Sequence, residues 1–143
     1  MAKYPKVLGL YTSRLRDPTR RLVIHLQVGP RLERYEVLAP STLKEMVLEA
    51  LSTLTDSDPN FPSRLEQTDA AEYQRNSYRS RRYFATDRNE LYPNSSHLTT
   101  KYSEKFKNFW LATNIGWNES RAILRMASKA AGVKYGAAGT IRF

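Results

Sequence analysis

Residues 42–54 have the sequence TLKEMVLEALSTL, the most regular apolar pattern in the chain. Thr42 and Glu45 fit a capping box, in which two side chains satisfy free backbone groups at the start of a helix. The apolar residues then recur at the spacing of one helix face: Leu43, Met46, Val47, Ala50, Leu51 and Leu54. Burial of the larger side chains would contribute on the order of 10 kcal/mol before chain entropy is subtracted. We therefore predict a helix that closes over a hydrophobic core.

The sequence before this helix predicts three strands of an antiparallel meander. The expected strands are residues 6–13, 21–28 and 32–38. In the second strand every other residue is apolar: Leu22, Ile24, Leu26 and Val28. Asp17-Pro18 and Gly29-Pro30 supply the turns. Residues 1–55 are therefore predicted to form a three-stranded sheet capped by one helix, and the fold class is α+β.

Residues 56–100 have a lower apolar content and contain Pro59, Pro62 and Pro93, which interrupt long regular elements. Part of 63–84 is expected to be helical, but no apolar stripe shows which face would pack. We predict an extended or partly helical basic and aromatic connection. A connection of this length in a compact domain is usually functional or disordered.

Residues 101–143 are predicted to form a helical hairpin with a C-terminal arm. The first helix, 101–113, places Tyr102, Phe106, Phe109 and Trp110 on one face, and Asn114-Ile115-Gly116 ends it. Asn118 is expected to cap the second helix, 119–131, with Trp117 and Ala122 forming a hydrophobic staple and Gly132 ending it. Residues 133–143 suit an edge strand or an arm laid on a neighbouring molecule. All three parts are expected to form one compact unit.

The composition excludes several classes of protein. The chain has 143 residues, no cysteine and two histidines, so disulfide frameworks, iron–sulfur clusters and thiol catalysis are ruled out. No long apolar run or signal peptide is visible, so we expect neither membrane insertion nor secretion, but a cytoplasmic or nucleic-acid-associated protein.

No constellation of residues predicts catalysis. His25 lies on the minority face of a strand, and His97 lies in a polar loop. The carboxylate pairs Glu45/Glu49 and Asp87/Glu90 lack supporting residues, and no glycine-rich phosphate loop or serine elbow occurs. We therefore expect no enzymatic activity, no cofactor and no metal.

The net charge of +9 is distributed unevenly along the chain. Residues 1–40 carry eight Lys+Arg against three Asp+Glu, and residues 73–143 carry thirteen against four. Residues 41–72 carry two against seven. Such sorting is typical of a surface that meets a polyanion. The alternative is that the acidic helix neutralises its basic neighbours when the chain folds.

Residues 73–84, YQRNSYRSRRYF, interleave four arginines with three tyrosines and a phenylalanine. Arginine binds phosphate with two hydrogen bonds, and aromatic rings stack on unpaired bases. The candidate nucleic-acid-binding residues here are Arg75, Tyr78, Arg79, Arg81, Arg82 and Tyr83. The alternative is a basic linker with rings packed on the helices and solvated arginines.

Residues around 111–131 resemble a helix-turn-helix. Ala112 and Gly116 match its small residue and turn glycine, and the apolar positions around the turn also match: Leu111, Ile115 and Trp117. Ala122 and Arg125 depart from the pattern. The resemblance implies a second helix in the DNA major groove, with these residues facing the nucleic acid: Asn118, Ser120, Arg121, Arg125 and Lys129. A plain helical hairpin explains the same apolar pattern.

The loop between the first two strands is a third candidate. Arg14, Arg16, Arg20 and Arg21 crowd it, and some DNA-binding modules place a small sheet in a groove with basic loops on the phosphates. Ordinary solubilising charge is the alternative.

These observations favour a non-enzymatic nucleic-acid-binding protein that contacts phosphates and unpaired bases through Arg, Lys and Tyr. A second hypothesis is a structural subunit of a nucleoprotein or viral assembly, such as a coat, scaffold or ribonucleoprotein component, because the middle segment and the arm suit extensions that lie on neighbours. The partner is thus nucleic acid, either DNA or RNA, with a homo-oligomer or larger assembly as a further expectation. An adaptor for an acidic protein also fits the charge.

Overall fold

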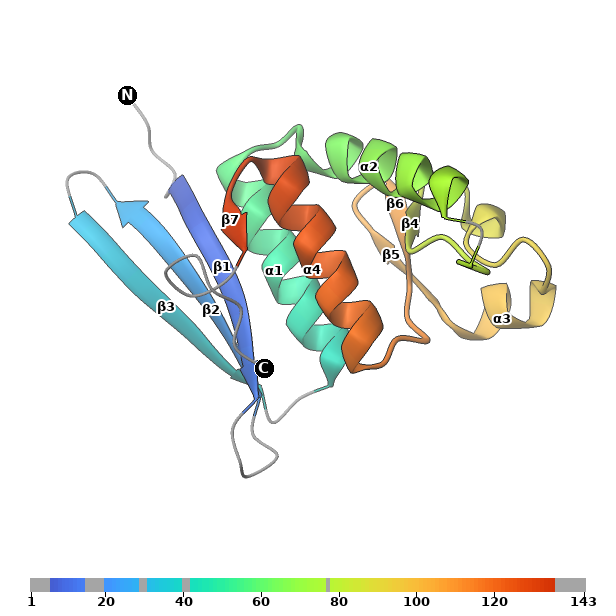
Figure 1. Cartoon of the computed structure of the whole chain (residues 1–143), viewed down its shortest axis with the longest axis horizontal. Coiled ribbons are helices and arrows are strands. Elements are labelled where there is room, and N and C mark those ends of the chain that lie inside the picture. The colour runs from blue at the N-terminus through green and yellow to red at the C-terminus, as the bar shows by residue number, and fades with distance from the viewer. Residues whose placement is uncertain (1–5, 15–19, 29–30, 40–41, 77, 136–143) are drawn as a thin grey trace.

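The computed structural model describes residues 6–14, 20–28, 31–39, 42–76 and 78–135, with side chains for 42–76 and 78–133. The fold is α+β (Figure 1). The N-terminal elements are β1 (Lys6–Arg14), β2 (Arg20–Val28), β3 (Arg31–Ala39), α1 (Leu43–Ser57) and α2 (Phe61–Arg75). The remaining elements are β4 (Phe84–Ala85), the 3-10 turn η1 (Arg88–Glu90), α3 (Ser96–Lys101), β5 (Ser103–Phe106), β6 (Phe109–Ala112), α4 (Trp117–Ala131) and β7 (Lys134–Tyr135).

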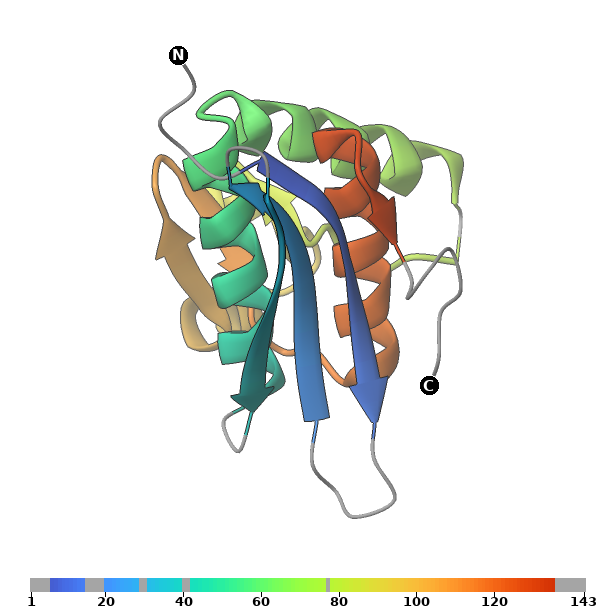
Figure 2. The ribbon, with the colours of Figure 1, turned by 90° about the vertical axis from the view of Figure 1, so that its left-hand side faces the viewer.

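The predicted three-stranded antiparallel meander is confirmed. β1 pairs with β2 and β2 with β3, and the short β7 adds a parallel fourth strand beside β1. Helices α1 and α4 lie against one face of this sheet, whereas one covering helix was predicted (Figures 1 and 2). The helix layer separates this sheet from α2 and from a second sheet, whose strand order is β4-β6-β5.

Helix α1 begins as the sequence predicted. The Thr42 hydroxyl accepts a hydrogen bond from the Glu45 backbone N–H at 3.2 Å, which satisfies one free group of the first turn. The predicted apolar face is buried: Met46, Val47, Ala50, Leu51 and Leu54. Leu43 is half-buried at its edge. The N-cap and the regular spacing of apolar residues were together sufficient to predict the position of this helix.

The Asp58 carboxylate stabilises the turn between α1 and α2. Asp58 caps α1 and accepts hydrogen bonds from the Asn60 backbone and from the Arg64 side chain. The Arg64 hydrogen bond, followed by that of Asn60, lowers the pKa of Asp58 below its usual value. Arg64 Nε also donates to the Ala130 carbonyl at 2.8 Å, so one side chain joins the C-terminal end of α1 to that of α4.

Residues 56–100 contribute to the core, although an irregular connection was predicted. Helix α2 has 15 residues and begins beside Pro62, which fits a first turn because the missing N–H has no partner there in any helix. Phe61, Leu65, Phe84 and Leu91 are fully buried. Phe61 and Leu65 lie in α2, Phe84 lies in β4 and Leu91 follows η1, so no single period in the sequence connects them.

The helix predicted over 101–113 is wrong. Helix α3 ends at Lys101, and residues 103–112 form the hairpin β5–β6, which turns at Lys107 with φ 55°. The aromatic spacing imitates a helix face, but aromatic residues also favour strands. Phe109 stacks on Phe84 with ring centroids 5.0 Å apart, which fixes the hairpin on the core.

The resemblance to a helix-turn-helix is therefore wrong, because Leu111 and Ala112 lie in β6. The two helices of this region, α3 and α4, are separated by the hairpin. Helix α4 starts at Trp117, with Gly116 as its N-cap and the Glu119 carboxylate accepting from the Gly116 N–H at 2.7 Å. The predicted Asn118 cap and the staple formed by Trp117 are consequently also wrong.

Helix α4 ends at Gly132, as predicted. Gly132 adopts the left-handed conformation, with φ 70° and ψ 30°. The chain then forms the edge strand β7, as expected for the start of the final segment. Residues 136–143 lie outside the described part of the chain.

We predict that Gly132→Ala lowers the free energy of unfolding by about 1 kcal/mol, the cost of the left-handed conformation for a residue with a Cβ atom. A Cβ atom at Gly132 would meet no other atom within 4 Å, so conformational strain is the only expected effect. Urea unfolding measures the difference. Gly132→Asn is the control and should cost less, because asparagine tolerates this conformation. Equal stability of the alanine variant and the wild type would contradict the prediction.

Candidate nucleic-acid interface

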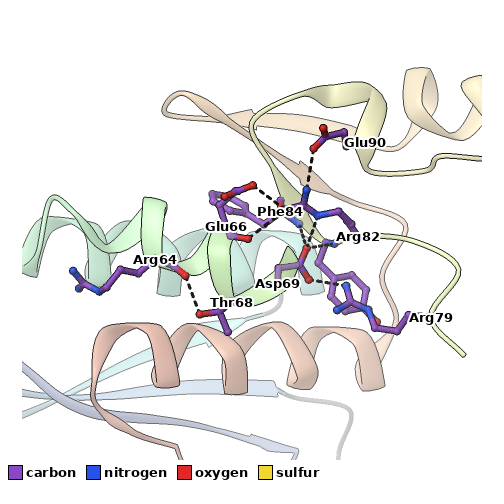
Figure 3. Close-up of polar contacts among 9 residues, drawn as sticks. Arg64, Glu66, Thr68, Asp69, Arg79, Arg82, Phe84 and Glu90 are labelled. Atoms are coloured by element: carbon purple, nitrogen blue, oxygen red, sulfur yellow. Dashed lines mark hydrogen bonds and ion pairs between the residues drawn. The ribbon is translucent and has the colours of Figure 1, made fainter. Parts of the chain in front are cut away.

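Part of the arginine–tyrosine segment, as we call residues 73–84, is anchored by a carboxylate that no sequence pattern indicated. Asp69 of α2 is fully buried, with 0% exposure. Its Oδ2 atom accepts hydrogen bonds from the backbone N–H groups of Tyr83 and Phe84 at 2.9 and 3.1 Å. Its Oδ1 atom accepts from Arg79 Nη2 at 2.6 Å (Figure 3). Asp69 thus fixes residues 79–84 on α2.

Arg82 is buried beside Asp69. Its Nη2 atom donates to Glu66 Oε1 at 3.0 Å and to the Phe84 carbonyl at 2.9 Å, and its Nη1 atom donates to Glu90 Oε2 at 2.9 Å. Its Nε atom lies 3.5 Å from Asp69 Oδ2. Three carboxylates therefore neutralise this guanidinium, which leaves it in the interior and unable to reach a phosphate.

Arg79 is also directed inward. Its guanidinium carbon lies 4.1 Å from the ring centroid of Tyr83 and 5.6 Å from that of Tyr73. The Nε and Nη1 atoms are buried and make no hydrogen bond to the described residues. Contact with the electron-rich ring faces stabilises the charge instead. Arg79 and Arg82 were predicted to bind nucleic acid, but the structure buries Arg82 and pairs Arg79, whose side chain is only 11% exposed, with Asp69.

Arg75, Tyr78 and Arg81 point away from the core. Tyr78 is 95% exposed, the largest exposed apolar side chain among the described residues. Arg75 is exposed and Arg81 half-buried, and neither forms an ion pair with a described residue. The segment therefore alternates between arginines that hold the fold and residues that remain accessible.

Helix α4 adds cations to the same surface. Arg121, Arg125 and Lys129 recur every four residues, so they lie on one stripe of the helix. Arg125 pairs with Glu72 of α2 at 3.4 Å while keeping 55% of its side chain exposed. Arg121 approaches the Asn118 side chain. Ser120, predicted to face the nucleic acid, is instead buried, and its hydroxyl donates to the Gly116 carbonyl.

These residues line a groove, which we call the α2–α4 groove. Its volume is about 420 Å³, and its lining is Glu72, Arg75, Asn76, Tyr78, Arg125 and Lys129. Three cations face one carboxylate here, and that carboxylate is already paired with Arg125. The sequence predicted four of the six lining residues, although it missed the packing of α2 against α4 that brings them together.

Other predicted positions lie apart from this groove. Arg14 ends β1, and Arg20 and Arg21 begin β2, on the far side of the helix layer from α2 (Figure 1). Their side chains and Arg16 lie outside the described residues. Tyr83 is half-buried under Arg79.

The structure also places one of the candidate carboxylate pairs and the described histidine. Asp87 caps η1, Glu90 binds Arg82, and His97 is exposed on α3 rather than in a loop. Among the described residues, no group of three or more metal-ligating side chains is close enough to hold an ion. Among the same residues, no helix has the length and apolarity needed to span a bilayer.

Comparison with known proteins gives no match. No protein family, no curated protein and no solved structure is significantly similar to the chain. Functional inference therefore depends on the geometry of the site alone.

We predict that Asp69→Asn lowers the free energy of unfolding by about 3–5 kcal/mol, the usual cost of removing one partner of a buried ion pair. Two arginines would lose their buried counter-charge. Chemical denaturation followed by circular dichroism measures this loss. The control is Glu90→Gln, which removes a carboxylate from the same Arg82 at a half-exposed position and should cost at most about 1 kcal/mol. Similar losses in both variants would contradict the role of Asp69.

Proposed function

We propose that this protein is a non-enzymatic nucleic-acid-binding protein whose phosphate-binding surface is the α2–α4 groove. One observation carries the proposal: a tyrosine that is 95% exposed stands in a groove with three cationic side chains. An exposed tyrosine ring in water has no stabilising role in the fold. An exposed aromatic ring together with unpaired cations is typical of a surface that binds phosphates and stacks on bases.

The three cations of the α2–α4 groove are spaced so that they could bind successive phosphates of a linear polyanion. Arg125 and Lys129 lie one turn apart on α4, about 6 Å along the helix axis, and Arg75 faces them from the end of α2. Arg75 and Lys129 have no carboxylate partner among the described residues, so phosphate binding requires no internal ion pair to break. The Arg125–Glu72 pair is exposed and contributes little to stability.

An acidic protein is a weaker candidate for the partner. Carboxylates would satisfy the cations, but they offer nothing to the exposed ring of Tyr78. Nucleic acid supplies phosphates and planar bases together, and it accounts for both features of the groove.

We predict that the double variant Arg125→Gln/Lys129→Gln binds a single-stranded oligonucleotide more weakly and with a shallower salt dependence. For a single strand, each phosphate contact contributes about 0.7 to the slope of log K against log salt. The loss of two contacts therefore lowers the slope by about 1.4. Fluorescence anisotropy at several salt concentrations measures both quantities.

The matched control is Lys101→Gln/Lys105→Gln, which removes the same charge from exposed positions on α3 and β5. This control should change the slope far less. Equal slopes for the two double variants would show that the groove makes no phosphate contact. If the wild-type protein binds neither single nor double strands at low salt, the proposed function is wrong.

A further inference from the structure

A second hollow adjoins the α2–α4 groove, and no residue of the proposed phosphate surface except Tyr78 lines it. Its volume is about 430 Å³, and Tyr78 forms part of both linings. The hollow, which we call the tyrosine pocket, lies between residues 78–83, the turn before α3 and the start of α4. A strand that leaves the groove past Tyr78 therefore meets this pocket next.

The wall of the pocket is aromatic and held in place. The Tyr92 hydroxyl donates to the Tyr102 carbonyl at 2.9 Å and accepts from the Asn114 N–H at 3.3 Å, so the buried ring of Tyr92 is fixed. Tyr83 is fixed by the guanidinium of Arg79, 4.1 Å from its ring centroid. A wall that is already ordered loses little conformational entropy when a ligand binds.

Two arginines line this pocket: Arg79, which is paired with Asp69, and Arg81. The Arg81 guanidinium carbon lies 5.7 Å from the ring centroids of both Tyr83 and Tyr92. Arg81 makes no ion pair with a described residue, in contrast to Arg79. Its N–H donors are therefore available to the phosphate or base edge of a ligand.

The remaining lining suits a neutral, hydrogen-bonding group. Asn94 and Asn114 supply exposed amides, and Glu119 places a carboxylate on the side of α4. That carboxylate repels a phosphate on its side, whereas it can accept hydrogen bonds from the amino groups of a base. The pocket thus combines stacking surfaces, amide groups and one free cation.

We infer that the tyrosine pocket holds one unpaired nucleobase of a single strand whose phosphates lie in the α2–α4 groove. This inference rests on the proposed function and adds the site that selects unpaired over paired nucleic acid. In a duplex the bases are stacked and paired and cannot enter a pocket of this kind without being flipped out.

The test compares two fluorescent oligomers of about 12 nucleotides, within the range of single-strand binding sites. One is a mixed-sequence DNA strand, and the other has the same phosphodeoxyribose backbone without bases. The full chain should bind the intact strand about tenfold more tightly than the abasic strand, in line with the usual gain from stacking a base on an aromatic ring. A duplex of the same sequence should also bind more weakly than the intact single strand.

Two variants test the contacts to the base: Tyr78 lines both the pocket and the groove, whereas Arg81 lines the pocket alone. Tyr78→Ala changes a side chain that is 95% exposed, so the fold is retained. It should lower affinity for the intact strand about tenfold and leave the abasic strand nearly unchanged. Arg81→Gln should weaken binding of the intact strand more than Lys105→Gln, which removes the same charge from an exposed site outside both linings.

The outcomes distinguish the two proposals. Equal affinity of the wild-type protein for intact and abasic strands, or equal effects of Arg81→Gln and Lys105→Gln, would overturn the base pocket and leave phosphate binding by the groove in place. Tighter binding of the duplex than of the single strand would also overturn the pocket. Failure of the wild-type protein to bind any oligomer would overturn the proposed function itself and the pocket with it.

Discussion

The carboxylate of Asp69 is the interaction on which the rest of this structure depends. It is completely buried, and it binds the Arg79 guanidinium and the backbone N–H groups of Tyr83 and Phe84. A buried carboxylate is costly unless its charge is compensated, and two arginines provide that compensation. Through these contacts, the segment that leaves α2 returns to the helix and continues into β4 of the second sheet.

This anchoring determines which cations remain available for a partner. Asp69, which is fully buried, binds both Arg79 and Arg82, and Glu66 and Glu90 also bind Arg82. Arg75 and Arg81 remain accessible, and Tyr78 projects from the same segment. The basic face of α4 then completes the groove because α2 packs alongside it, with Arg125 bound to Glu72 and Arg64 bound to the Ala130 carbonyl. Under the proposed function, stability and nucleic-acid recognition thus use different arginines of one short segment.

The parts of the fold with strict periods could be predicted from the sequence. The meander and α1 follow from alternation and from the face that includes Met46 and Leu51, and Gly132 marks the end of α4. The hairpin at 103–112 could not be predicted, because its aromatic residues fit a helix period as well as strands. The role of residues 56–100 also escaped prediction, since Phe61, Phe84 and Leu91 enter the core from separate elements.

The sequence could predict which kinds of residue form the candidate site, but not which individual arginines are accessible in it. Composition identified the arginine–tyrosine segment and the stripe on α4. Nothing in the composition distinguished Arg82, which is buried, from its neighbour Arg81, which lines the tyrosine pocket. The sequence feature that could have indicated this difference is the pair Glu66 and Asp69, which lie three residues apart on α2 within the acidic stretch 41–72. Such carboxylates can neutralise arginines that follow in the chain, which was the alternative explanation of the charge sorting.

The central claim is that folding divides the arginines of this segment into buried and accessible ones. Labelling of the native protein with phenylglyoxal, which modifies accessible guanidinium groups, followed by peptide mass spectrometry, tests this division most directly. The structure predicts rapid modification of Arg75 and Arg81 and protection of Arg79 and Arg82 until the protein is unfolded. Modification of all four arginines at similar rates in the native state would contradict the account.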